Sequence, residues 1–339
     1  MRRSMLFLPG NTPNVIQNGD VLGADAVIFD LEDAVAPDQK DAARILVRNT
    51  MTYLDFSKVE TIVRINSVDT DFWKKDLETI LPLKPTLIMP PKTSTAQDVL
   101  TVDAYMCELE DKLGMERNTV KLIPLIETAL GLENAFQIAA ASKRVAALFL
   151  GAEDLTADLR CKRTKESEEI AYARGRMVAA ARAAGVDVYD TPFTDVNDDE
   201  GIRIDTEKAK ALGFTGKASI SPRHVPVINE VFSPSQRDID YAYEVMEAIR
   251  IDTEKAKALG FTGKASISPR HVPVINEVFS PSQRDIDYAY EVMEAIRIAK
   301  EQGRGAIALR GKMIDAPIVN RAKQTIEAAE ELGLGRSEH

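Results

Sequence analysis

Short apolar runs alternate with longer amphipathic segments along most of the chain, and this pattern predicts an α/β fold. The runs have the length of buried strands, whereas the segments between them repeat apolar residues at helical spacing. The predicted strands cover residues 5–8, 26–31, 61–65, 86–89, 122–126, 147–150, 186–189 and either 216–220 or 263–267. The predicted helices between them cover residues 13–18, 38–54, 71–80, 94–113, 130–141 and 167–184. A count of eight such units predicts a TIM (β/α)8 barrel, followed by a C-terminal lid-like helical extension.

The last unit of the pattern is present twice. Residues 203–249 and 250–296 are identical at all 47 positions, and each copy has an α-β-α pattern. Repeats in solenoid proteins diverge and usually number three or more, so complete identity indicates a recent or an engineered duplication. The tripeptide Ile-Arg-Ile at 202–204, 249–251 and 296–298 is a short match of the kind at which recombination duplicates a segment.

A closed eight-stranded barrel has room for only one of the strands 216–220 and 263–267. Both copies share every local preference, so the sequence does not choose between them. We expect one copy to complete the barrel and the other to lie outside it, because a long surface insertion adds little loop-closure entropy. The predicted domains are therefore a barrel over 1–298 with one copy outside it, and a C-terminal extension or lid over 299–339.

Two predicted strands end in acidic residues. Glu127 follows strand 122–126, and Asp154 closes the stretch Leu-Gly-Ala-Glu-Asp after strand 147–150. Active sites of parallel barrels lie at the carboxyl ends of the strands, so we expect the two carboxylates side by side. Adjacent carboxylates repel unless a proton or a cation lies between them, and Mg²⁺ prefers oxygen ligands while keeping waters that a substrate can displace. The alternative is that Glu127 caps the next helix and Asp154 closes a turn.

Positive charge and small residues occur at the same predicted edge. Arg64 lies near the end of strand 61–65, where its planar guanidinium could hold a carboxylate in two-point contact. Lys92 follows two prolines and could add positive charge, although both residues could also form ordinary surface ion pairs. Gly151 and Ala152 carry no bulky side chain, so their amides could approach a substrate carboxylate.

Further acids surround this site or lie in the tail. Glu32 and Asp33 follow strand 26–31, and Glu153 precedes the metal-binding candidate; all three are expected around the site, orienting metal-bound water or Arg64. Asp315 is the one acid between the glycine-rich segment of the tail and its last helix, in a stretch that could close as a lid. A helix N-cap is the alternative for Asp315.

Composition excludes several classes of function. A formal net charge of −10 argues against nucleic acid as a partner, and no apolar run is long enough to span a membrane. Cys107 and Cys161 lack the spacing of a zinc site or a disulfide framework, which fits a reducing cytoplasm. The N-terminus has no signal-peptide pattern, and Walker, dinucleotide-binding and hydrolase-elbow motifs are absent from the sequence.

Seven short stretches form a recognisable set. They are Arg-Arg-Ser-Met-Leu-Phe-Leu-Pro-Gly (2–10), Phe-Asp-Leu-Glu-Asp-Ala-Val (29–35), Thr-Ile-Val-Arg-Ile-Asn (61–66), Pro-Lys-Thr (91–93), Ile-Glu (126–127), Leu-Gly-Ala-Glu-Asp (150–154) and Gly-Lys-Met-Ile-Asp (311–315). With them the chain resembles the HpcH/HpaI aldolase/citrate lyase family, most closely its citrate lyase β subunits, and also malyl-CoA and citramalyl-CoA lyases. The duplication departs from the family pattern and affects the placement of the tail.

The resemblance implies a TIM barrel with Mg²⁺ on Glu127 and Asp154 and with substrate on Arg64 and Glu127. It also implies that the segment holding Asp315 closes over an active site, often a neighbour's, and Asp315 is then a possible proton donor. The general base stays open.

The implied reaction is cleavage of a citryl thioester on an acyl-carrier protein (ACP) to oxaloacetate and acetyl-ACP. The implied partners are other citrate lyase subunits and a homo-oligomer such as a trimer or hexamer. The alternatives are a stand-alone lyase or thioesterase acting on citryl-, malyl- or citramalyl-CoA, and a non-catalytic subunit of a lyase complex. The intact set of Arg64, Glu127 and Asp154 argues against the last.

Overall fold

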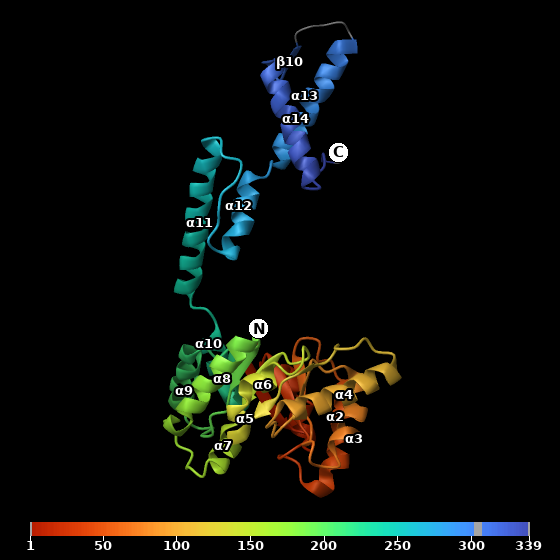
Figure 1. Ribbon diagram of the computed structural model, residues 1–339, viewed down its shortest axis with the longest axis vertical. Helices are drawn as coiled ribbons and strands as arrows, with labels where there is room; N and C mark the ends of the chain where they lie inside the picture. Colours follow the sequence, from red (N-terminus) through yellow and green to blue (C-terminus); the bar gives the residue numbers. More distant parts are fainter. Residues whose placement is uncertain (1, 302–306, 338–339) are drawn as a thin grey trace. The chain divides into compact units, whose positions relative to one another are not determined.

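The computed structural model describes residues 2–301 and 307–337, and the chain divides into two compact units, Met1–Ser233 and Pro234–His339 (Figure 1). Among the described residues, no helix combines the length and the apolar character that crossing a membrane requires. The domain boundary predicted at residue 298 remains a prediction.

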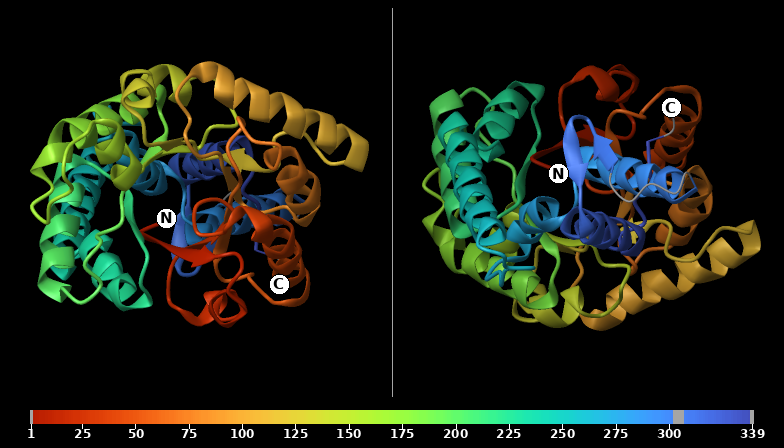
Figure 2. Two further views of the ribbon diagram at one scale, coloured as in Figure 1. Left: turned by 90° about the horizontal axis from the view of Figure 1, so that it is seen from below. Right: turned by 90° about the horizontal axis from the view of Figure 1, so that it is seen from above.

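The first unit is a parallel sheet covered by helices. Its strands are β1 (Ser4–Pro9), β2 (Ala26–Asp30), β3 (Glu60–Arg64), β4 (Leu87–Met89), β5 (Lys121–Leu122), β6 (Leu125–Ile126), β7 (Ala147–Leu150), β8 (Asp187–Asp190) and β9 (Gly216–Ser219). Its helices are α1 (Pro13–Ile16), α2 (Lys40–Tyr53), α3 (Trp73–Ile80), α4 (Ala96–Leu113), α5 (Ala129–Glu133), α6 (Ala135–Ala139), α7 (Ala152–Asp158), α8 (Ala171–Ala184), α9 (Asp199–Leu212) and α10 (Val225–Phe232). Figure 2 shows these helices on the outside of the curled sheet.

The predicted closed, eight-stranded TIM barrel is wrong. The sheet has nine strands in the open order β5-β4-β3-β2-β1-β9-β8-β7-β6, so that β5 and β6 stand at its two ends. The predicted strand 122–126 is divided into these two short strands at Ile123 and Pro124. Proline has no N–H group to donate to a strand ladder, which explains the interruption. Of the predicted fold, the α/β class is what the structure retains.

Burial on both faces of the sheet explains why its strands read as continuous apolar runs. Val27 and Phe29 of β2 belong to the core between the sheet and the helices, whereas Ala26 and Ile28 of the same strand belong to a second core inside the curl. On the helical side, α2 contributes Val47 to the outer core. Because every strand pair is parallel, all carboxyl ends lie at one edge of the sheet.

The two identical copies have different structures. The first copy provides most of α9, all of β9 and α10, and β9 pairs with both β1 and β8. The second copy lies in the second unit, where the corresponding residues 263–267 are not in a strand. The elements of that unit are α11 (Gln236–Ala258), α12 (Val272–Phe279), α13 (Gln283–Glu301), β10 (Ile307–Leu309), β11 (Lys312–Ile314) and α14 (Ala316–Glu331). Within it, α11 packs on α12 and α13 packs on α14, while β10 and β11 form an antiparallel hairpin (Figure 1).

Candidate functional site

A pocket of about 330 Å³ lies at the carboxyl ends of the strands of the first unit. Its lining comes from seven different strands and the segments that follow them, and it consists of Phe7, Pro9, Asp30, Asp33, Ala34, Arg64, Leu125, Glu127, Phe149, Gly151, Ala152, Glu153, Asp154, Thr191, Pro192 and Ile220. A larger and more open hollow, of about 750 Å³, lies near the amino ends of β2, β3 and β4. Ligands of parallel α/β sheets bind at the carboxyl ends of the strands, so the smaller pocket is the candidate site.

Arg64 at the end of β3 is held in one orientation. Its Nε and Nη2 donate to the two carboxylate oxygens of Asp30, at 2.7 and 2.5 Å, because the two residues are in register on neighbouring strands. Its guanidinium carbon lies 5.2 Å from the centre of the Phe7 ring. Nη1 is 3.2 Å from a carboxylate oxygen of Glu32. The two-point partner of Arg64 is therefore Asp30, while Nη1 faces Glu32, and a role of Arg64 in substrate binding stays a prediction.

Glu127 is buried directly after β6 and is positioned by backbone groups. The backbone N–H of Lys92 donates to its Oε1 at 2.7 Å, and Lys92 has a φ of +50°, which is uncommon for a residue other than glycine. A Cβ atom at position 151 would lie 2.8 Å from Oε2 of Glu127, so Gly151 is the residue that leaves room for this carboxylate.

The electrostatics at Glu127 favour a cation. Burial raises the pKa of Glu127 to about 8, although the Lys92 amide and the charge of Arg64 act to lower it. The neighbouring carboxylates of Asp154 and Glu32 raise that pKa further. At neutral pH this carboxyl group therefore takes up a proton unless a positive ion relieves the repulsion.

The donor set fits Mg²⁺. Asp154 lies half-buried in the first turn of α7 and lines the pocket together with Glu127. The described part of the chain contains no cluster of three or more acidic, histidine or cysteine side chains that could hold a metal ion. Two carboxylates are enough for Mg²⁺, which usually keeps several waters and completes its shell with substrate oxygens.

A second group of charges lies beside the pocket. Lys92 Nζ is 2.6 Å from a carboxylate oxygen of Glu32 and 3.4 Å from one of Asp33. Burial acts to lower the pKa of Lys92, but its bond to Glu32 and the nearby acids outweigh burial and raise it. For Glu32 burial dominates and raises the pKa. The ammonium group of Lys92 is thus held by the loop after β2.

The structure brings most of the predicted site residues to one place. Arg64, Glu127, Gly151, Ala152, Glu153, Asp154 and Asp33 line the pocket, and Glu32 and Lys92 contact Arg64 and Glu127, respectively. The roles predicted for all of them stay predictions.

The amides predicted to bind substrate already have partners. Gly151 N–H donates to the carbonyl oxygen of Ile126 at 2.9 Å, and Ala152 N–H donates to Oγ1 of Thr191 at 3.2 Å. A substrate carboxylate would have to replace these bonds, so the predicted amide contacts of both residues stay predictions.

Asp315 belongs to the second unit. It is the N-cap residue of α14, where its carboxylate accepts the N–H of Ile318 at 3.1 Å. The capping geometry is the alternative that the sequence left open, and it does not exclude a further role because the side chain is exposed.

Among the lining residues not predicted from the sequence, Asp30, Phe7 and Thr191 contact predicted ones directly. Asp30 carried a signal, since it is an acid within an otherwise apolar strand and therefore needs a buried partner. Phe7 and Thr191 carried none, because their contacts depend on how neighbouring strands are aligned.

The fold and the site define an α/β enzyme with an acidic, arginine-containing pocket at the strand ends, and the comparisons specify which kind. The profile of the HpcH/HpaI aldolase/citrate lyase family matches residues 3–222. The chain belongs to this family. The family expected from the sequence and its enzyme class, carbon–carbon lyases, are thereby confirmed.

Individual relatives agree with this assignment. The chain is 36% identical over 329 residues to citrate lyase subunit beta of Haemophilus influenzae, covering 97% of each chain. It is 36% identical over 266 residues to an L-malyl-CoA/beta-methylmalyl-CoA lyase of Cereibacter sphaeroides, covering 73% of this chain and 83% of that one. A solved citrate lyase beta subunit of Mycobacterium tuberculosis, complexed with oxaloacetate and magnesium, is 32% identical with a TM-score of 0.59 and covers 69% of this chain and 97% of that chain. Magnesium, expected here from paired acids, is thus the ion in a solved member of the family.

Proposed function

We propose that this chain is a Mg²⁺-dependent carbon–carbon lyase that splits a citryl thioester on an acyl-carrier protein into oxaloacetate and an acetyl thioester. In this proposal it acts as the β subunit of citrate lyase. The observation that carries the proposal is the meeting of Glu127, Asp154 and Arg64 in one pocket at the strand ends. The full-length similarity to citrate lyase β subunits supports the choice of substrate.

The chemistry requires one bond to break and two protons to move. The bond between the hydroxyl-bearing carbon of the citryl group and the methylene next to the thioester breaks, and its electron pair passes to the thioester enolate. The hydroxyl group loses its proton and becomes the keto oxygen of oxaloacetate, while the enolate gains a proton.

In this proposal, different residues contribute to binding the ion, binding the substrate and transferring the proton. Glu127 and Asp154 would hold Mg²⁺, which when bound acidifies the hydroxyl group and stabilises the oxygen that becomes the ketone. Arg64, fixed by Asp30, offsets carboxylate charge on the substrate. The Lys92 amide keeps Glu127 in place. Asp315 is the proposed proton donor to the enolate.

The partners and the compartment are part of the proposal. We infer other citrate lyase subunits as partners by similarity to the β subunits. We also propose the acyl-carrier protein and further copies of this chain, as a trimer or hexamer. Cys107 and Cys161 are both free thiols, which supports a reducing cytoplasm.

A second candidate is a stand-alone lyase or thioesterase that acts on citryl-, malyl- or citramalyl-CoA. Its support is the similarity to malyl-CoA lyases and thioesterases, which cover about seven-tenths of this chain. The acids and the arginine suit both candidates, since citryl, malyl and citramalyl thioesters all carry a hydroxyl group and a carboxylate on the carbon β to the thioester carbonyl.

An assay of the purified full chain separates these functions. We expect oxaloacetate from citryl-CoA, used in place of the carrier-bound substrate, in the presence of Mg²⁺. We expect no product after EDTA treatment and recovery when Mg²⁺ is added again, because two carboxylates alone cannot stabilise the developing negative charge. Faster release of glyoxylate from malyl-CoA would favour the second candidate. A folded, Mg²⁺-supplied chain that cleaves neither thioester would contradict both.

A further inference from the structure

The sheet position between β1 and β8 is occupied by the first of two identical segments. Gly216–Ser219 of the first copy pairs through residues 217–219 with Ser4, Met5 and Leu6 of β1, and through residues 216 and 217 with the end of β8. The second copy contains the same residues as Gly263–Ser266, outside any sheet.

The space and the burial at this position restrict which residues can occupy it. A Cβ atom at Gly216 would lie 2.1 Å from the backbone oxygen of Arg2, so only glycine fits. The next residue, Lys217, is fully buried, and its Nζ lies 2.6 Å from Asp190 and 2.7 Å from Asp205. A buried ammonium group needs such partners.

The second copy has the same residues at the corresponding positions. Gly263 corresponds to Gly216, Lys264 to Lys217 and Asp252 to Asp205. A Cβ atom at Gly263 would touch nothing within 4 Å, so this glycine has no role where it now lies.

The second copy also keeps the helix packing of the first. In the first copy Lys210 donates to the carbonyl oxygen of Val231 at 2.6 Å, and in the second Lys257 donates to that of Val278 at 2.7 Å. The ion pair of Arg203 with Glu230 likewise recurs between Arg250 and Glu277. The helical segments on either side of residues 263–266 therefore contact each other in the same way as α9 and α10 on either side of β9.

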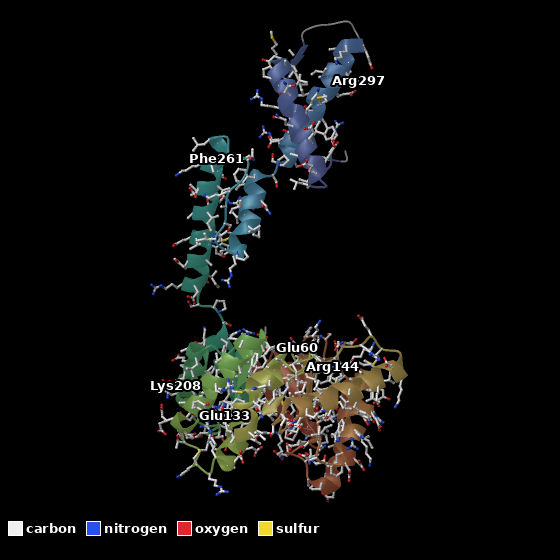
Figure 3. The ribbon with its side chains drawn as sticks, viewed as in Figure 1. Glu60, Glu133, Arg144, Lys208, Phe261 and Arg297 are labelled. Carbon is white, nitrogen blue, oxygen red and sulfur yellow. The ribbon has the colours of Figure 1, made fainter. Side chains whose placement is uncertain are left out.

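Apolar side chains of the second copy lack the cover that the sheet gives to the first. Phe261 is 62% exposed, whereas its counterpart Phe214 is 4% exposed. Figure 3 shows Phe261 in the second unit at the end of α11. The second copy thus exposes an apolar face. The surface that could bury this face is the part of the first unit that the first copy already covers.

We propose that the two copies exchange within one molecule, so that either Gly216–Ser219 or Gly263–Ser266 fills the position between β1 and β8. Either arrangement places one copy in the sheet and leaves the 47 residues of the other copy outside it.

The first-copy arrangement is favoured by two residues that come just before the first copy in the sequence, because both contact residues near or within that copy. Asp198 caps the N–H of Gly201 at 2.8 Å, and Asp199 pairs with Arg223 at 2.7 Å. The residues that would take the places of the two acids in the second arrangement are Val245 and Met246, which offer no carboxylate. Loss of a helix cap and an exposed ion pair shifts the equilibrium between the two arrangements by roughly tenfold in favour of the first copy.

Three glycine variants of the full chain test the exchange. In Gly216→Val the first copy is blocked by backbone contacts, so the second copy fills the sheet. We expect a folded protein with the oligomeric state of the wild type and a thermal midpoint close to that of the wild type. Gly263→Val should match the wild type, because position 263 is open. The double variant should lose the cooperative unfolding transition of the first unit.

The outcomes are separable. Exchange is overturned if Gly216→Val unfolds as readily as the double variant, or if the double variant unfolds as the wild type does. A folded Gly216→Val whose oligomeric state by native mass spectrometry is larger than that of the wild type would place a neighbouring molecule's copy in the sheet and would also overturn exchange within one chain. Lys217→Met, Lys264→Met and their double variant give a second, independent set for which the same pattern is expected.

Discussion

Replacing Asp154 with asparagine is expected to lower kcat/KM for citryl-CoA by about a hundredfold or more, and Glu127→Gln is expected to do the same. Each change removes one negative oxygen ligand from a pocket that offers two acids to the ion. The loss is expected in kcat as well as in KM, because the ion acts on charge that develops during bond cleavage. Initial rates of oxaloacetate formation at several Mg²⁺ concentrations measure it.

The matched control is Asp158→Asn in the same helix as Asp154. Asp158 accepts the N–H of Ala129 at 2.7 Å outside the pocket, and an asparagine oxygen can keep that bond. Asp158→Asn should retain the wild-type rate, and all three variants should unfold at the wild-type midpoint. Wild-type turnover by Asp154→Asn would refute the metal-binding role of this residue.

The largest loss of stability is expected for Arg144→Met. Arg144 is fully buried, donates to both carboxylate oxygens of Glu110 at 2.8 Å, and donates to Asp103 at 2.7 Å. Methionine would fill much of the space but would leave the carboxylate of Glu110 buried without its ion-pair partner, with the N–H of Asn118 still donating to it at 3.2 Å. Breaking a buried ion pair in this way costs about 3–5 kcal/mol of unfolding free energy.

Arg117→Met is the control for charge removal. Arg117 also pairs with a carboxylate, that of Asp111, through two nitrogen atoms, but both side chains are exposed. Water replaces such a partner readily, so the denaturation midpoint should stay at the wild-type value. Urea denaturation of both variants measures the difference. Figure 3 marks Arg144 in the first unit. Equal midpoints for the two variants would contradict the account.

The α/β class followed from the sequence because buried parallel strands and amphipathic helices have distinct periodicities. The open form of the sheet did not follow from the sequence, since strand pairing at Pro124 depends on backbone donors that an apolar pattern does not report. The duplication shows that local sequence alone does not determine secondary structure in this chain. The segment 216–219 is a strand and the identical segment 263–266 is not, so tertiary contacts decide the structure of this sequence.

The candidate site was predictable where it depended on strand ends. Glu127, Asp154 and Arg64 each follow or end an apolar run, and parallel strands bring such residues to one edge. Asp30 was missed because its pairing with Arg64 depends on strand register. The raised pKa of Glu127 was also beyond the sequence, since it arises from burial.

Metal binding to the full chain tests the central claim most directly. Isothermal titration with Mg²⁺, checked by the electron paramagnetic resonance of bound Mn²⁺, should show a saturable site in the wild type and in Asp158→Asn. The double variant Glu127→Gln/Asp154→Asn should show no such site while remaining folded by circular dichroism. Unchanged binding in that double variant would contradict the claim that these two carboxylates hold the ion.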